Sequence, residues 1–183
     1  VGVGVLVIHG RVLVGVGVSV LLHVVRQSNT VVVKQRVAGP GGHLLEVDPP
    51  IGVAGHDVVV LQPYGSLFFA SAPVFEAALP QVTADSRGSV VIIRLRGRVD
   101  LGTTFIEVLA RYAAQLDAVG SRLLVVSVED RVLSQLTTGG VIDLIGSDAV
   151  YGGDERLGAA LARATTDARA WVTSRQVGGS DPP

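Results

Sequence analysis

The sequence predicts an α/β fold, a mixed β-sheet with helices packed on it, preceded by an apolar segment of membrane type. The sheet is predicted because the apolar runs at residues 90–95 and 123–126 have the length of buried strands and an amphipathic stretch joins them. The membrane-type segment is predicted because residues 1–25 are almost entirely Val, Gly, Leu and Ile. The later residues mix apolar and charged side chains, and a chain of 183 residues can bury one sizeable core.

The composition excludes several classes of function. The formal net charge is −1 and only 15 residues are Lys or Arg, so the chain lacks the basic surface that binds nucleic acid through its phosphates. The absence of cysteine excludes disulfides, thiolate metal sites and cysteine catalysis. A mean hydropathy of +0.50 is high for a wholly soluble protein. Part of the chain is therefore expected in or against a membrane.

The apolar segment, residues 1–25, is interpreted as the remnant of a membrane region. Residues 12–25 would form about 21 Å of helix, which is shorter than the roughly 20 residues of a full span. They would cross a bilayer only in part or pack beside other helices. Arg26, Lys34 and Arg36 follow, and the positive-inside rule places the chain after about residue 26 in the cytoplasm. The alternative is a buried β-hairpin, because Val-Gly alternation suits strands.

Two ionisable residues, Arg11 and His23, stand within this apolar segment. Such groups are costly in a membrane and often functional, but their side chains can also reach the interface, which is the interpretation we favour. The chain begins at Val1, without the charged stretch that opens a signal peptide. We therefore expect it to be the C-terminal piece of a longer protein.

The next part of the chain consists of short strands and turns. A polar connector at 27–30 leads to a strand at 31–37, followed by Gly- and Pro-rich turns at 39–42 and 48–50. No Lys-Ser or Lys-Thr pair follows these glycines, so they predict a hairpin turn rather than a phosphate-binding loop. The elements that follow are a strand at 58–61, a turn at 63–65, a strand at 66–70, a helix from Pro73 and a closing turn at 85–88.

The second half alternates strands and helices. After the strand at 90–95 and a turn at Asp100, an apolar stripe predicts a helix that ends at Gly120. Thr104 and Glu107 have the spacing of a capping box at its start. The stripe consists of Phe105, Val108, Leu109, Tyr112, Ala113 and Leu116. The remaining elements are a strand at 123–126, a helix at 130–138 stopped by Gly139 and Gly140, a helix over 154–173 and a disordered tail.

The residues that usually carry catalysis or bind metals do not form a recognisable pattern. No G-x-S-x-G motif presents a nucleophile. The four histidines are far apart in the sequence and lack metal-ligand spacing, which gives His9, His23, His43 and His56 no shared role. Four carboxylates fall at predicted helix or strand ends and are interpreted as caps and solvated charges: Glu129, Asp130, Asp143 and Asp148. We expect no catalytic residue, no metal and no cofactor.

The sequence from about residue 58 to residue 171 resembles a STAS domain, the sulfate-transporter and anti-sigma-factor-antagonist module. Three segments carry the resemblance: Gly-Ser-Leu-Phe-Phe-Ala at 65–70 before a helix, Asp-Leu-Gly-Thr at 100–103, and Gly-Val-Ile-Asp-Leu-Ile-Gly at 140–146 before an Ala- and Leu-rich helix. The apolar segment before them resembles the last membrane segment of a SulP anion transporter. The resemblance thus implies a STAS-like mixed sheet attached to a membrane region.

The turn that opens the helix after the central strand is the family's signature turn, formed here by Asp100, Leu101, Gly102, Thr103 and Thr104. In the anti-sigma-antagonist branch an Asp-Ser pair is followed by the hydroxyl that is phosphorylated. Gly102 occupies that position and has no hydroxyl, so a phosphorylation switch is not expected unless Thr103 or Thr104 substitutes for it. Asp100 is expected to be the helix N-cap, worth about 1 kcal/mol.

The resemblance implies that the chain is the C-terminal regulatory or assembly domain of a secondary-active transporter for an inorganic anion such as sulfate or bicarbonate. The anion would bind elsewhere in the full protein, which would be a homodimer in the cell (inner) membrane. A regulatory protein would bind at the signature turn, and the domain itself would not be an enzyme. The alternatives are a soluble STAS signalling module of the anti-sigma-factor-antagonist type, and a nucleotide-binding domain.

The expected organisation has four parts. Residues 1–25 are the membrane remnant, 26–57 a linker with the first strands, 58–175 the STAS domain and 176–183 a disordered tail.

Overall fold

The computed structural model describes residues 15–20, 31–65, 67, 71–153, 156 and 158–178. The chain divides into two compact units, Val1–Thr30 and Val31–Pro183. In the first unit residues 15–20 are helical, while the rest of the predicted membrane segment, 1–25, lies outside the described residues. Within the described part of the chain, no helix combines the length and the apolar character that crossing a membrane requires.

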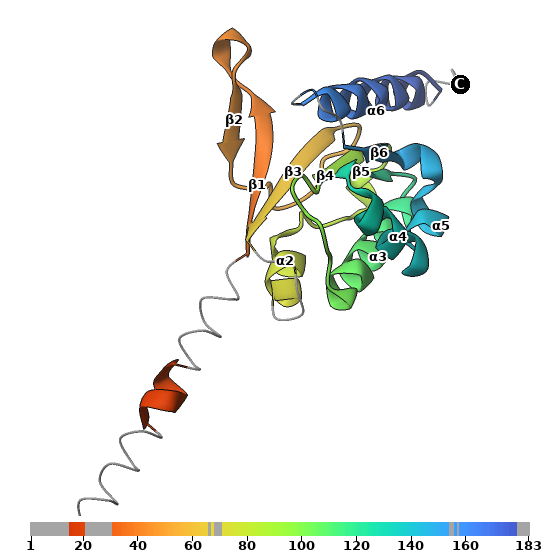
Figure 1. Ribbon diagram of the computed structural model, residues 1–183. Coiled ribbons are helices and arrows are strands. Elements are labelled where there is room, and N and C mark those ends of the chain that lie inside the picture. The colour runs from red at the N-terminus through yellow and green to blue at the C-terminus, as the bar shows by residue number, and fades with distance from the viewer. Residues whose placement is uncertain are drawn as a thin grey trace, which may run out of the picture. The chain divides into compact units, whose positions relative to one another are not determined.

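The second unit is built on a six-stranded mixed sheet with the strand order β2-β1-β3-β4-β5-β6 (Figure 1). The first three strands pair antiparallel and the last four parallel, as expected where helices connect successive strands. The strands are β1 (Val31–Ala38), β2 (Leu44–Val47), β3 (Val58–Gly65), β4 (Val90–Arg94), β5 (Arg122–Val128) and β6 (Val150–Gly152).

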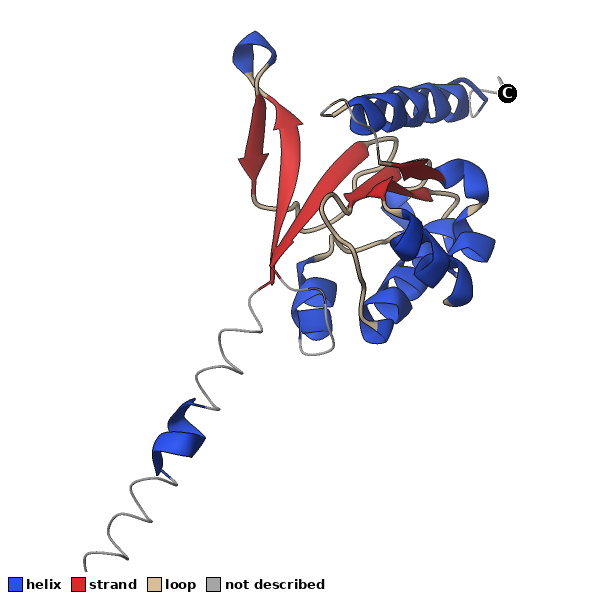
Figure 2. Ribbon diagram, viewed as in Figure 1, coloured by secondary structure: helices blue, strands red, loops and turns tan. Residues whose placement is uncertain are grey.

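Helices cover both faces of the sheet (Figure 2). In the second unit, α6 packs on one face, against β3, β4, β5 and β6, and the remaining helices of this unit lie on the opposite face, where α4 packs on α5. The helices are α2 (Ala72–Ala78), α3 (Thr103–Ala118), α4 (Asp130–Thr138), α5 (Val141–Ile145) and α6 (Ala159–Gly178). Short 3-10 turns occupy Pro40–Gly42, Ala84–Ser86 and Ser147–Ala149.

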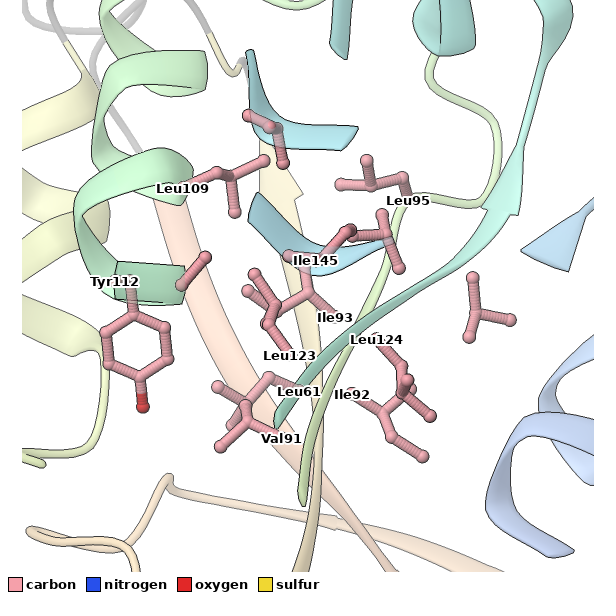
Figure 3. Close-up of a cluster of buried hydrophobic side chains, with 14 of the residues drawn as sticks. Leu61, Val91, Ile92, Ile93, Leu95, Leu109, Tyr112, Leu123, Leu124 and Ile145 are labelled. Atoms are coloured by element: carbon pink, nitrogen blue, oxygen red, sulfur yellow. The ribbon is translucent and has the colours of Figure 1, made fainter. Parts of the chain in front are cut away.

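The core follows from the period-two alternation of the strands. On one side of the strands, Leu109 and Tyr112 of α3 face Val91 and Ile93 of β4, while Ile92 points to the opposite side (Figure 3). The whole of β4 is buried, as predicted for a central parallel strand. All six residues of the predicted stripe of α3 are buried, and Ile106 adds a seventh.

One predicted boundary differs from the structure, and one predicted strand lies almost wholly outside the described residues. The turn expected at 63–65 is wrong, because β3 continues to Gly65 and pairs with β1. Among the described strands only β1 pairs with β3 beyond Leu61, so Pro63 has no strand partner on its β4 side, and a proline is tolerated there. The strand expected at 66–70 lies outside the described residues except for Leu67, which is not in a strand.

The folded unit also extends beyond residues 58–175 at both ends. Residues 31–47, grouped with the linker by the sequence, supply β1 and β2 to the sheet, joined by the predicted hairpin turn at Pro40–Gly42. At the other end, α6 continues to Gly178, three residues into the segment assigned to the tail.

Candidate functional site

The signature turn lies in the loop between β4 and α3, at the carboxyl end of the parallel strands. Arg98 fixes this loop to the end of β3: Nη2 donates to the carbonyl of Pro63 at 3.0 Å, and Nη1 donates to the carbonyl of Gly65. The backbone N–H of Leu95 donates to the carbonyl of Val126 at 2.8 Å. Burial lowers the pKa of the Arg98 guanidinium. The loop is therefore anchored to the sheet on both sides before the turn begins.

Asp100 faces α4, and two side chains of that helix bind its carboxylate. Nη2 of Arg131 donates to Oδ2 of Asp100 at 2.8 Å, and the amide of Gln135 donates to Oδ1. The same amide also makes two hydrogen bonds to the backbone of Leu101. Gln135 Oε1 accepts from the N–H of Leu101 at 3.0 Å, and Nε2 donates to the carbonyl of Leu101 at 3.2 Å. These contacts fasten the turn to α4.

The predicted capping of α3 is wrong. Gly102 is the N-cap residue and no side chain caps the helix, so Asp100 does not serve that role. The carbonyl of Gly102 accepts from the N–H groups of Phe105 and Ile106, at 2.9 and 3.1 Å. Thr104 is already inside the helix, so it cannot form a capping box with Glu107. The physical reason is that Asp100 lies two residues before the N-cap position of α3, and its carboxylate is bound by side chains of α4.

The five residues of the turn differ in their exposure. Leu101 is buried in the core, and the N–H of Gly102 donates to the carbonyl of Leu67 at 3.0 Å. Thr103 is exposed and Thr104 half-buried, and no hydroxyl stands at position 102 where the resemblance would place the phosphorylated group. Val99, just before the turn, is 70 % exposed. The turn therefore presents Val99, part of Asp100 and Thr103 to solvent on a rigid base.

The sequence analysis missed a polar row that crosses β2, β1, β3 and β4 near their ends. Nη1 of Arg94 donates to Oε1 of Gln62 at 3.0 Å, and Nε of Arg36 lies 3.7 Å from Oε1 of Glu46. The hydroxyl of Tyr64 donates to Glu46, and this bond raises the pKa of Tyr64. A polar residue at the end of an apolar strand, such as Arg94 after residues 90–93, was the available signal.

Four carboxylates were predicted at the ends of helices or strands, and all four lie at the starts of helices. Glu129 is the N-cap residue of α4, and Asp130, Asp143 and Asp148 stand in the first turns of their helices. Arg122 Nη2 donates to Oδ2 of Asp148 at 2.7 Å, and this hydrogen bond lowers the pKa of Asp148. The described residues contain no group of three or more His, Asp or Glu side chains that could hold a metal ion.

Comparisons with known proteins relate the fold to one family. The family model of the STAS domain matches residues 51–153. No curated protein matches the chain.

Two solved structures share the fold. The structure of the murine Solute Carrier 26 family member A9 anion transporter in the inward-facing state has a TM-score of 0.62 and 18% sequence identity, covering 87% of this chain and 25% of that one. The crystal structure of a sulfate transporter family protein from Wolinella succinogenes has a TM-score of 0.51 and 24% identity, covering 66% of this chain and 91% of that one. This chain thus spans about a quarter of the length of the murine transporter.

Proposed function

Because this chain belongs to the STAS domain family, we propose that it is the regulatory and assembly domain of a secondary-active transporter for an inorganic anion, sulfate or bicarbonate. The observation that carries the proposal is the order of its parts, an apolar segment at residues 1–25 directly before a STAS fold. A fold match that includes an anion transporter over 87% of the chain supports it. Translocation would occur in parts of the protein outside this chain.

The domain would act by binding and not by catalysis. The turn from Asp100 to Thr104 is held by hydrogen bonds to Arg131, Gln135 and the Leu67 carbonyl, and these bonds restrict its conformation. A rigid turn loses little conformational entropy on docking, which favours a role as a contact surface. We propose that this turn contacts a regulatory protein or the second copy of a homodimer.

Regulation by phosphate at position 102 is not part of the proposal. Gly102 offers no hydroxyl, and its backbone groups are occupied by Leu67, Phe105 and Ile106. The domain would therefore respond through its contacts with the membrane part and with partner proteins. In this proposal the apolar segment lies in the cell (inner) membrane and the chain after about residue 26 is in the cytoplasm.

The second candidate is a soluble STAS signalling module that binds a regulatory protein. It is favoured by the compact unit Val31–Pro183, which holds its own core and presents the signature turn. The two candidates differ in what residues 1–25 do.

A membrane fractionation separates the two candidates. The 183-residue chain and a matched chain of residues 31–183 would be expressed in parallel, and the membranes washed at high salt and high pH. The transporter proposal requires the longer chain to stay in the membrane fraction and the shorter chain to be released. Release of both chains contradicts it and favours the signalling module. The coding sequence upstream of residue 1 provides a second test, since about a dozen apolar spans are expected there.

A further inference from the structure

The strand β2 forms one edge of the sheet, and its outer side has no strand partner among the described residues (Figure 1). All four of its residues are exposed. Three of them are large apolar residues: Leu44 is 57 % exposed, Leu45 47 % and Val47 39 %. An exposed apolar edge strand is a template for pairing with another chain, and most proteins protect such an edge.

The usual protection of an edge strand is missing or neutralised at β2. The strand contains no proline and no lysine, and its charges come from Glu46 and from Asp48, which follows the strand. Nζ of Lys34 donates to Oδ1 of Asp48 at 2.7 Å. Glu46 accepts from the hydroxyl of Tyr64 and lies 3.7 Å from Nε of Arg36. Both carboxylates are thus paired with side chains of β1 and β3, and their charge does not repel a second strand.

The hydrogen bonds of the β1–β2 hairpin show which backbone groups of β2 point outward. The N–H of Gly39 donates to the carbonyl of His43 at 2.7 Å, so His43 directs its backbone groups to the first strand of the hairpin. The direction alternates along an antiparallel ladder. Leu44 and Glu46 therefore direct their N–H and C=O groups to the free edge, and Leu45 between them bonds to β1.

A second copy of β2 fits this edge when the two strands run antiparallel and Leu45 lies opposite Leu45 of the copy. Leu44 then lies opposite Glu46 of the copy, and Glu46 opposite Leu44. These are the residues whose backbone groups point outward, so each of the two pairs exchanges two hydrogen bonds. The two Leu45 residues form a pair without hydrogen bonds, in which opposing side chains are closest.

Charge and shape favour this register. A shift of the copy by two residues would place Glu46 opposite Glu46, and like charges directly opposite each other are destabilising. In the Leu45 register each Glu46 faces a leucine. Leu45 and Val47 stand opposite Val37 and Gln35 of β1, so Leu45, Val47 and Val37 of both copies gather on one face of the joined sheet. Because β2 supplies its own complement, the occupant that fits its edge is a second copy of the chain.

We propose that two copies of this protein associate edge to edge through β2, about a two-fold axis at Leu45, and so join their sheets. The contact is short, so the association is expected to be weak, and holding both chains close together would strengthen it. None of the residues of the signature turn lies in β2, so the turn stays available to a regulatory protein. The inference does not rest on the transporter proposal, and its test is separate from the fractionation above.

Disulfide crosslinking tests the register, because the chain has no cysteine and an introduced one can pair only with its copy. The 183-residue variants Leu45→Cys and Val47→Cys would be oxidised in detergent micelles with copper phenanthroline and followed on non-reducing gels. In the proposed register the Cα atoms at position 45 lie about 4.5 Å apart, within the range of a disulfide, and those at position 47 about 14 Å apart. Leu45→Cys should therefore crosslink at least about tenfold faster. Val47 is a matched control, because it lies on the same face of the same strand and is similarly exposed.

A proline at position 44 tests the backbone hydrogen bonds. The N–H of Leu44 points outward, so its loss leaves the β1–β2 ladder intact. His43 has φ −72° and ψ 145°, the extended conformation that a residue before proline prefers. In the Leu45→Cys background, Leu44→Pro should slow crosslinking at least about tenfold, and Leu44→Ala, which keeps the N–H, should slow it less.

Three results would overturn the proposal. No crosslinking at position 45 would leave the edge to a strand of another protein. Crosslinking at position 47 that is as fast as at position 45 would show random collision or another register. Equal slowing by Leu44→Pro and Leu44→Ala would show that the outward N–H makes no contact. If the proline variant fails to fold, the comparison of positions 45 and 47 still decides.

Discussion

Asp100 and Arg131, 31 residues apart in the sequence, form an ion pair in which Oδ2 lies 2.8 Å from Nη2. The pair joins the loop after β4 to the outer side of α4, and Gln135 completes the connection one turn further along the helix. The aspartate of the signature turn therefore fixes the position of the turn and does not cap the helix that follows. Its mutation should consequently act through the α4 contact.

The first prediction compares how much Arg131 and Gln135 each contribute to the stability of the turn. The Arg131 side chain is 72 % exposed and that of Asp100 is 32 % exposed, so Arg131→Ala should lower the free energy of unfolding by less than about 1 kcal/mol. Gln135→Ala leaves the N–H of Leu101 without its partner and should cost about 1–3 kcal/mol. Urea unfolding of both variants measures the difference. Equal losses would mean that the ion pair stabilises the turn as much as the amide does, which would contradict the prediction.

The second prediction concerns the close approach of α3 and the end of α4. A Cβ at Gly139 would lie 2.3 Å from Cγ2 of Ile106, although the backbone there has an ordinary negative φ of −82°. Gly139→Ala should therefore cost about 1–3 kcal/mol through overpacking alone. The control is Gly152→Ala, whose Cβ would meet only the Val128 carbonyl at 3.9 Å.

A double-mutant cycle tests this cause. Ile106→Ala removes the methyl group that a Cβ at position 139 would meet, so Gly139→Ala should cost less in that background than in the wild type. Additive losses would show that the glycine is needed for another reason. The free energies of unfolding of the four proteins, measured in urea, complete the cycle.

The strands and the apolar stripe of α3 could be predicted because they follow local rules. A run of four apolar residues and a 3.6-residue period are visible without knowing the fold, and the six predicted stripe residues are all buried. The contacts of Asp100 follow no such rule. Arg131 and Gln135 are polar residues on an amphipathic helix, and only the packing of α4 on α5 determines which loop they meet.

The same reason explains why the sequence analysis missed Arg94, the member of the polar row that belongs to β4. Arg94 continues the strand alternation after Ile92, which would predict a side chain on the face of α6. Its burial, however, depends on β1, β2 and α6 covering that end of the sheet, and these elements are more than 45 residues away along the chain. The extension of β3 through Pro63 likewise depends on β1, since turn propensity alone predicts an end there.

The third prediction concerns three buried serines at the start of β4 and β5. Ser121 Oγ donates to the carbonyl of Ser86 at 2.6 Å and accepts from the N–H of Ser89 at 3.1 Å. Ser121→Ala would leave that N–H buried without a partner and should cost about 1–3 kcal/mol. Ser134→Ala, at an exposed position on α4, should change stability by less than about 0.5 kcal/mol. Similar losses in urea unfolding would contradict a role for the buried hydroxyl.

The last prediction uses Tyr112, whose hydroxyl donates to the carbonyl of Pro80 at 2.9 Å. Burial raises the pKa of Tyr112 above its ordinary value of 10.0, so the folded state holds the phenol proton more tightly than the unfolded state. The contribution is fully present below about pH 10. Above that pH the unfolded chain releases the proton first, and the wild type should lose up to about 1.4 kcal/mol per pH unit.

The variant Tyr112→Phe has nothing to ionise at this position. It should be about 1 kcal/mol less stable than the wild type below pH 10, because the Pro80 carbonyl loses its donor, and the gap should narrow above pH 10. Tyr151, whose pKa burial and Asp167 raise to about 12, is present in both proteins and cancels in the comparison. Urea unfolding of both proteins between pH 8 and about pH 11 measures the gap. A constant gap would show that Tyr112 does not titrate differently in the folded and unfolded chains.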